Sequence, residues 1–206
     1  SQVVTLELSK TDENEVKLKA ALESMTDAIF ISDLEGNFIE FNEAFATFHK
    51  FKDKEECAKT LQEYPIFLDV FYPDGEFVPI EMWVVSRALR GETGLNKEYK
   101  IKRKDTGETW VGIYNYAPIR NSEGDIIGSV VTARDITDLK KSQQEIKIAK
   151  KKVEESEERF NLAMKASKDG LFDWNLMTNE IYYSPGWKNM LGFEDNELPN
   201  DFTIRE

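Results

Sequence analysis

The residues that could carry covalent or metal chemistry are few, because the chain has one histidine and one cysteine among 206 residues. His49 lies among lysines at the end of a candidate helix, and we interpret it as a surface or structural residue and not as an axial metal ligand. Cys57 lies between acidic neighbours, which give its thiol no reason for a lowered pKa. One imidazole and one thiol cannot complete a zinc site or attach haem c. The sequence therefore predicts no metal site, and with neither a nucleophile elbow nor a phosphate-binding loop it predicts no catalytic residue.

Charge and composition narrow the class of protein further. The formal net charge is −12, with 27 basic and 39 acidic residues, which disfavours binding to a phosphate backbone. A hydrophobic content of 40% excludes wholesale disorder. Apolar runs fall far short of the roughly 18 residues that a membrane span needs, and the sequence shows no signal peptide. A single cysteine fits a reducing compartment. We expect a cytoplasmic protein without nucleic-acid or membrane contacts.

The elements that would position any site follow from hydrophobic periodicity. A loose lead-in over 1–12 precedes an amphipathic helix over 13–25, in which Leu18, Leu22 and Met25 share a face. Two strands form a hairpin around Gly36, and three later strands form a meander. The expected strands are 28–32, 38–41, 99–102, 110–119 and 126–133, the expected short helices are 43–48, 54–61 and 79–90, and 62–78 reads as a loop. This order predicts an α+β domain with one sheet and helices on one face.

A long charged helix follows the domain. Leu139, Ile146, Val153 and Phe160 recur every seven residues from 139 to 160, with small residues at the alternate seam positions. In a parallel pair of helices, Glu145 would face Lys150 of the partner, and Lys152 would face Glu157. We favour a parallel homodimer through this seam, and a single solvated amphipathic helix is the alternative.

The sequence also contains an internal repeat at a shift of 142 residues. Without gaps, this shift pairs residues of the opening hairpin and helix with residues near the end of the chain. The pairs are Asp27 with Asp169, Phe30 with Phe172, Leu34 with Leu176, Asn37 with Asn179, Ile39 with Ile181, Phe41 with Tyr183, Phe45 with Trp187, Phe51 with Phe193 and Asp53 with Asp195. We therefore expect 160–206 to be the truncated start of a second copy of the first domain.

Several motifs together resemble the PAS sensor domains. They are the run Asp27 to Asn42, the turn Lys104 to Val111, the run Ala117 to Arg120 with Gly124, and Arg134-Asp135-Ile136-Thr137. The second copy resembles the start of another PAS domain, with Thr178 where the family usually has glycine. The resemblance implies a PAS fold: a five-stranded antiparallel sheet with helices on one face, flanked by an N-terminal helix and a C-terminal coiled-coil helix. The implied boundaries are 13–139 for the PAS domain with its flanking helix, 138–160 for a signalling coiled coil and 160–206 for the second, truncated PAS domain.

The resemblance also implies two sites. Family members bind ligands between the sheet and the helix around 79–90, where the candidates here are Phe30, Phe45, Phe48, Trp83, Tyr114 and Tyr116, although aromatic residues at such spacings equally fill cores. Strand alternation does not say which face of 110–119 points inward. Asp135 and Thr137 would tie the exit helix to the domain, as a switch or as a static cap. The flavin-adduct cysteine motif and the haem histidine of the helix at 79–90 are absent, so the cofactor is unknown.

The resemblance predicts a sensory module. It would couple binding of a small molecule or partner to repacking of a dimeric exit helix that controls a downstream output domain, such as a histidine kinase. A ligand-free dimerisation scaffold is the alternative, and an enzyme acting on a small molecule in the pocket is a third. We expect no enzymatic activity from this stretch of chain.

Overall fold

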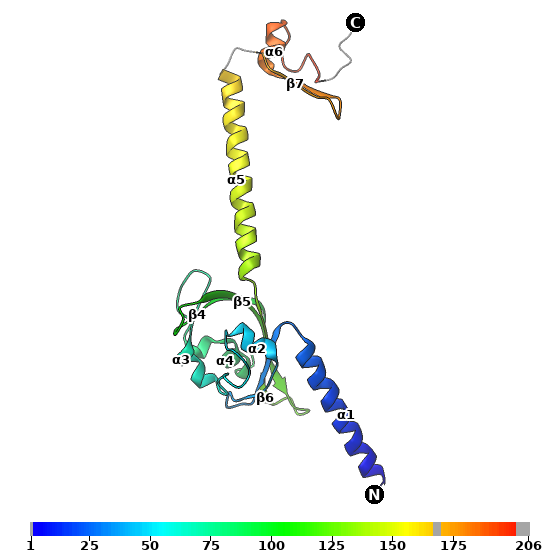
Figure 1. Cartoon of the computed structure of the whole chain (residues 1–206), viewed down its shortest axis with the longest axis vertical. Helices are drawn as coiled ribbons and strands as arrows, with labels where there is room; N and C mark the ends of the chain where they lie inside the picture. Colours follow the sequence, from blue (N-terminus) through cyan, green and yellow to red (C-terminus); the bar gives the residue numbers. More distant parts are fainter. Residues whose placement is uncertain (1, 167–169, 201–206) are drawn as a thin grey trace. The chain divides into compact units, whose positions relative to one another are not determined.

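The computed structural model describes residues 2–166 and 170–200 (Figure 1). The chain divides into two compact units, the first up to Lys141 and the second from Ser142. The first unit contains the predicted α+β domain. The second contains most of the long helix and the predicted repeat.

The sheet of the first unit has six antiparallel strands in the order β2-β1-β6-β5-β4-β3. The strands are β1 (Ala28–Ser32), β2 (Phe38–Phe41), β3 (Leu68–Phe71), β4 (Gly94–Arg103), β5 (Thr109–Arg120) and β6 (Ile126–Asp135). The prediction of five strands is therefore wrong by one, because β3 lies in the segment predicted as a loop. Leu68 and Val70 alternate toward the core, and β3 pairs with β4. Period-two burial over only four residues is too short a signal to stand out from loop sequence.

Short helices lie on one face of this sheet (Figure 1). They are α2 (Glu43–Phe48), η1 (Leu61–Glu63), α3 (Tyr64–Phe67), η2 (Ile80–Met82) and α4 (Val84–Leu89). The predicted helix over 54–61 is instead a set of turns, in which the Asp53 carboxylate accepts the Glu56 amide at 3.1 Å. The predicted helix over 79–90 is divided at Trp83, whose extended backbone (ψ 154°) separates η2 from α4.

The N-terminal helix is longer than predicted. Helix α1 (Gln2–Ser24) includes almost all of the segment expected to be a loose lead-in over 1–12. The reason is that 2–24 contains no glycine or proline to end a helix. Of the predicted apolar face, Leu22 is buried, whereas Leu18 and Met25 are 60% and 46% exposed. Among the side chains of 13–24, only those of the last turn of α1 therefore pack on the domain.

The core lies between the sheet and its helices. Along β5, Trp110, Gly112, Tyr114 and Tyr116 point inward, which resolves the face that alternation alone left open. Glycine is required at 112, since a Cβ there would lie 2.7 Å from the ring of Phe48.

The second unit repeats the opening of the first domain locally. Helix α5 (Thr137–Ala166) begins at the end of β6, one residue before the predicted start, and continues beyond residue 160. After it come β7 (Phe172–Asn175), β8 (Glu180–Tyr183) and α6 (Pro185–Met190). At the shift of 142 residues, β8 and α6 coincide with β2 and α2. The predicted partner of Asp27, Asp169, lies outside the described residues.

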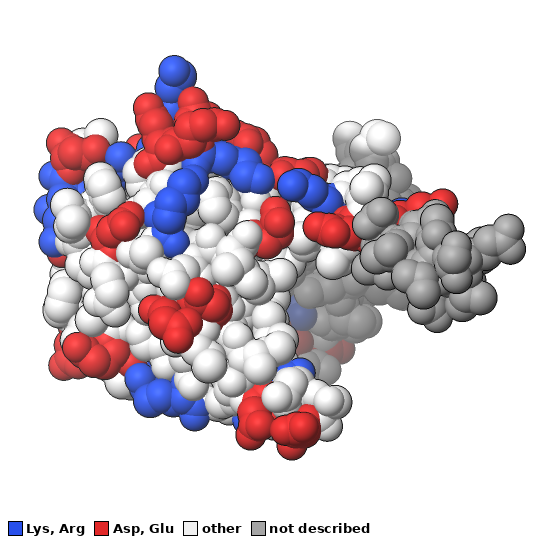
Figure 2. Space-filling view, turned by 90° about the horizontal axis from the view of Figure 1, so that it is seen from below, with Lys and Arg blue, Asp and Glu red and all other residues white. Residues whose placement is uncertain are grey.

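Surface charges of both signs are interspersed. Figure 2 shows Asp and Glu side chains beside Lys and Arg side chains on the face in view, and neither sign forms an extended patch there. Among the described residues, no helix is both long and apolar enough to span a membrane.

Candidate functional site

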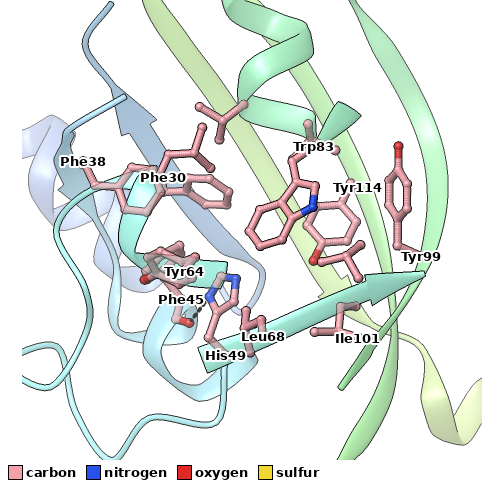
Figure 3. Close-up of a pocket in the computed structure, with 14 residues that line it drawn as sticks. Phe30, Phe38, Phe45, His49, Tyr64, Leu68, Trp83, Tyr99, Ile101 and Tyr114 are labelled. Carbon is pink, nitrogen blue, oxygen red and sulfur yellow. Dashed lines mark hydrogen bonds between the residues drawn. The ribbon is translucent and has the colours of Figure 1, made fainter. Parts of the chain in front are cut away.

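A small apolar cavity lies between the sheet and the helices of the first unit (Figure 3). Its volume is about 50 Å³, and aromatic and aliphatic side chains line it. One water needs roughly 10–15 Å³, and a cavity of about 150 Å³ holds benzene. The cavity can therefore take a few waters or a molecule of a few heavy atoms, unless a side chain at its edge moves.

Four of the six predicted pocket residues line this cavity: Phe30, Phe45, Trp83 and Tyr114. Phe48 and Tyr116 do not. Phe48 is buried against Trp110 and Tyr114. The ring of Tyr116 packs so closely on Gly94 that a Cβ at residue 94 would lie 2.4 Å from it. These two side chains belong to the core, as the alternative interpretation of the aromatic residues held.

The sequence did not predict that the other lining residues belong to the cavity. They are Phe38, His49, Leu61, Tyr64, Leu68, Val70, Val84, Val85, Tyr99 and Ile101. Leu68 and Val70 were missed because β3 was missed. His49 could have been found from its spacing, since it follows Phe45 by four residues and so lies on the same face of α2.

His49 is buried, not at the surface, with 6% of its area exposed. It caps the C-terminus of α2, and its Nδ1 lies 3.0 Å from the carbonyl oxygen of Phe45 (Figure 3). Arg103 holds this end of the helix in place, because its guanidinium donates to the carbonyl oxygens of His49 and Lys50 at 2.9 and 2.8 Å. Burial lowers the pKa of His49 to about 3, and the nearby charge of Arg103 adds to this shift. The imidazole is therefore neutral near pH 7.

The next residue, Lys50, leaves the helix in a left-handed conformation (φ 60°) and reaches the strand-to-helix junction. Its ammonium group lies 3.0 Å from the carboxylate of Asp135, 3.7 Å from that of Glu108 and 5.2 Å from the centre of the Trp110 ring. Partial burial alone would raise the pKa of Asp135, but hydrogen bonds from Thr137 and Lys50 outweigh it and lower that pKa. Asp135 is therefore a carboxylate held by a lysine from the end of α2.

Thr137 joins the same junction to β5. Its amide and hydroxyl both donate to Asp135, at 2.9 and 2.5 Å, and its hydroxyl oxygen accepts the amide of Val111 at 2.9 Å. The Ile136 amide donates to the Val111 carbonyl at 2.8 Å. The predicted pair Asp135 and Thr137 therefore fixes the first turn of α5 to the sheet and, through Lys50, to α2.

The cavity and the junction share one piece of backbone, because His49 lines the first and Lys50 reaches the second. The lining of the cavity and the contacts at the start of α5 are therefore joined through two adjacent residues.

The remaining candidates have simpler surroundings. The predicted seam residues Leu139, Ile146, Val153 and Phe160 are each more than half exposed along α5. Cys57 is buried, and burial raises the pKa of its thiol to about 11. In the part of the chain that the structure describes, no three His, Cys, Asp or Glu side chains are grouped as metal ligands would be.

Comparison with known proteins gives one family. Residues 22–141 match the PAS fold. A stretch of 58 residues is 40% identical to "Hybrid signal transduction histidine kinase A" of Dictyostelium discoideum. This stretch makes up 28% of this chain but only 3% of that protein.

Solved structures show similar domains. The PAS domain of a protein from Colwellia psychrerythraea covers 60% of this chain, with 98% of its own length matched, 21% identity and a TM-score of 0.41. The PAS domain of BvgS from Bordetella pertussis covers 67% of this chain, with 98% of its own length matched, 15% identity and a TM-score of 0.42.

Proposed function

The chain belongs to the PAS fold family, and we propose that its first domain is a sensory module whose cavity takes a small molecule and whose exit helix reports the occupancy. The observation that carries this proposal is the continuous path from the cavity through His49 and Lys50 to Asp135 and Thr137. The similarity to a signal-transduction histidine kinase supports a signalling role for the domain. The downstream output would be a histidine kinase or a similar domain, and the module would act in the cytoplasm without catalytic activity of its own.

The exit helix would act as a parallel homodimer. Support comes from the exposed apolar seam, because Ile146 and Val153 are 69% and 56% exposed on a helix rich in lysine and glutamate. Exposed apolar side chains repeating every seven residues are typical of a surface that pairs with a second helix. A change of packing at this seam is the output that the domain would send onward.

We further propose that 160–206 begins a second PAS domain. Its strands and helix repeat those of the first copy at the shift of 142 residues, and so do its helix caps. The Asn42 side chain accepts the amides of Ile29 and Phe45, and the Ser184 hydroxyl accepts those of Leu171 and Trp187. A shared capping pattern at equivalent positions supports a shared fold.

Ligand occupancy is tested on the freshly purified chain by native mass spectrometry together with an absorption spectrum. The proposal expects a mass above that of the polypeptide, or a complex that forms on adding a small aromatic molecule. A bare polypeptide that binds no such probe would instead favour the alternative, a ligand-free PAS dimerisation scaffold.

The seam is tested by light scattering of a double variant, Ile146→Asp with Val153→Asp. We expect monomers, because buried charges at two seam positions cost more than the contacts they replace. Ile148→Asp is the matched control, since Ile148 is an exposed isoleucine of the same helix that lies off the seam. A double variant that remains a dimer would refute the seam.

A further inference from the structure

The single histidine of the chain lies inside a cage of aromatic rings. The centres of the Phe45 and Phe48 rings lie 4.4 and 5.0 Å from the imidazole centre, and that of Tyr64 lies 5.2 Å away. The imidazole lies against these rings and also lines the cavity, where Figure 3 shows it beside Phe45 and Tyr64. A polar group in such a setting is costly unless it has a hydrogen-bond partner.

The contact to Phe45 fixes the position of the proton on this imidazole. The carbonyl oxygen of Phe45 accepts the backbone amide of His49 at 3.1 Å and contacts Nδ1 at 3.0 Å. A carbonyl oxygen can only accept, so Nδ1 must carry the hydrogen. Because the ring is neutral, the other nitrogen, Nε2, then carries a lone pair and can only accept.

Within the described residues, Nε2 has no hydrogen-bond partner, and it points away from the Phe45 carbonyl toward the cavity. Two other polar atoms of the lining already have hydrogen-bond partners. The indole nitrogen of Trp83 donates to the Val78 carbonyl at 2.9 Å, and the Tyr64 hydroxyl donates to the Ala58 carbonyl at 3.3 Å. Nε2 is therefore an open acceptor on a wall that is mostly apolar.

One further polar atom lies near the same space. Figure 3 shows the hydroxyl of Tyr114 directed into the cavity, and in the described part of the chain no group bonds it. Burial raises the pKa of this phenol well above its usual value, so it stays neutral. A phenol can donate or accept, which makes it tolerant, whereas Nε2 of His49 is selective because it only accepts.

We propose that His49 sets the ligand class of the cavity: a small neutral molecule with an apolar body and one N–H or O–H group that donates to Nε2. This inference rests on the proposed function of the cavity as a ligand site. It disfavours carboxylates and other anions, because Nε2 offers them no hydrogen and the lining offers them no cation. It also excludes cations, since the lining offers no carboxylate.

The cavity also limits the size of this molecule. About 50 Å³ is less than the volume that holds benzene, so the ligand has few heavy atoms or displaces a side chain at the edge. Trp83 is the side chain placed to move, because it is only partly buried and lies where the backbone is extended between η2 and α4. A five-membered ring is a suitable probe.

Pyrrole and furan are a matched pair for the test, because they have nearly the same shape and only pyrrole carries an N–H donor. The whole chain is labelled with ¹⁵N in histidine, and the single imidazole then gives one pair of ring signals. We expect the unliganded protein to show a protonated Nδ1 and an unprotonated Nε2. Pyrrole should shift the Nε2 signal, furan should not, and pyrrole should bind about tenfold more tightly, as one hydrogen bond predicts.

His49→Phe is the paired variant, because it keeps an aromatic ring and removes the acceptor. In it, pyrrole and furan should bind equally. A proton on Nε2 in the unliganded wild type would overturn the inference, and this measurement requires no variant. A preference for pyrrole that persists in His49→Phe would overturn it as well. Equal binding of both probes to the wild type would overturn this inference alone and leave the cavity a ligand site. Binding of neither probe would overturn the cavity as a ligand site and this inference with it.

Discussion

Residues 28–51 and 170–193 have the same local structure but very different surroundings. In both, a hairpin leads into a helix of six residues whose cap accepts the amide three residues later. Phe30 in β1 is 4% exposed, whereas Phe172 at the equivalent position is 58% exposed. Strands β5 and β6 and the helices around them cover the first copy. Local sequence is thus enough to form the hairpin and helix, and burial depends on residues far along the chain.

The two copies also differ where the helix ends. His49 and Lys50 in the first copy correspond to Leu191 and Gly192 in the second, and Lys50 and Gly192 both have a left-handed backbone (φ 60° and 85°). Glycine adopts this conformation freely, whereas lysine is strained there by about 1–2 kcal/mol. In the first copy, Lys50 in this conformation forms an ion pair with Asp135 at 3.0 Å. The end of α2 therefore carries contacts that the end of α6 lacks.

The largest expected effect is at the helix caps. Asn42 is buried and makes five hydrogen bonds, to the amides of Ile29 and Phe45 and to carbonyls of 22–27. Asn42→Ala should lower the free energy of unfolding of the first domain by about 3 kcal/mol, because it leaves several buried groups unpaired. Urea unfolding followed by NMR signals of β5 measures this.

Ser184→Ala is the control at the equivalent position. It removes a cap worth about 1 kcal/mol within the second copy and should leave the transition of the first domain unchanged. If Ser184→Ala shifts the transition of the first domain as much as Asn42→Ala does, the stability of the first domain depends on the second copy, which would contradict this expectation.

The next effect is on pH dependence. Because burial lowers the pKa of His49 from 6.5 to about 3, the unfolded chain binds a proton in this range that the folded chain does not. Stability should therefore fall as the pH falls below 6.5, by about 2 kcal/mol between pH 6.5 and 5. In His49→Phe this loss should be missing.

Carboxylates with lowered pKa values, such as Asp105 and Asp135, also destabilise the fold in acid, but only near and below their ordinary pKa values. They are common to the wild type and the variant, so they cancel in the difference. Unfolding free energies that run parallel for the two proteins from pH 7 to 5 would show that His49 is not buried as a neutral group.

A smaller effect distinguishes the two hairpin turns. Gly36 has a φ of 83°, and a Cβ there would lie 3.3 Å from the Cβ of Leu61. In the second copy, the equivalent residue is Thr178, but the positive φ is at the next residue, Asn179. Gly36→Thr should cost the first domain about 1–2 kcal/mol. Thr178→Gly should change stability by less than about 1 kcal/mol, and a larger loss there would mean that the turns are equivalent after all.

The smallest effect separates strain from contact at Lys50. Lys50→Gly and Lys50→Ala both remove the ion pair with Asp135, but only glycine also relieves the left-handed backbone. We expect the glycine variant to be about 1 kcal/mol more stable than the alanine variant by urea unfolding. Equal stabilities would mean that the backbone at residue 50 relaxes once the lysine is removed.

The sequence predicted the features that depend on local pattern. The α+β class, the hairpin around Gly36, helix 43–48 and the strands of the meander are confirmed by the structure. Strand β3 was not predicted, because its four residues give too little alternation to identify. The helix expected over 54–61 was wrong since side-chain turns such as that of Asp53 replaced it.

The cavity could be predicted only in part. Aromatic residues identified Phe30, Phe45, Trp83 and Tyr114, but spacing could not separate them from Phe48 and Tyr116, whose positions depend on contacts across the sheet. His49 was misplaced because its neighbours in sequence, Lys50 and Lys52, are charged. What buries it are Phe30 and Tyr64, from distant parts of the chain.

The central claim is that occupancy of the cavity changes the packing of the exit helix. The most direct test is the dissociation constant of the dimer, measured by analytical ultracentrifugation with and without saturating pyrrole. Since coupling between two sites is reciprocal and typically worth 1–3 kcal/mol, we expect the constant to change by about fivefold or more, and the change to be lost in Lys50→Ala. A dissociation constant that is the same with and without bound pyrrole would contradict the claim.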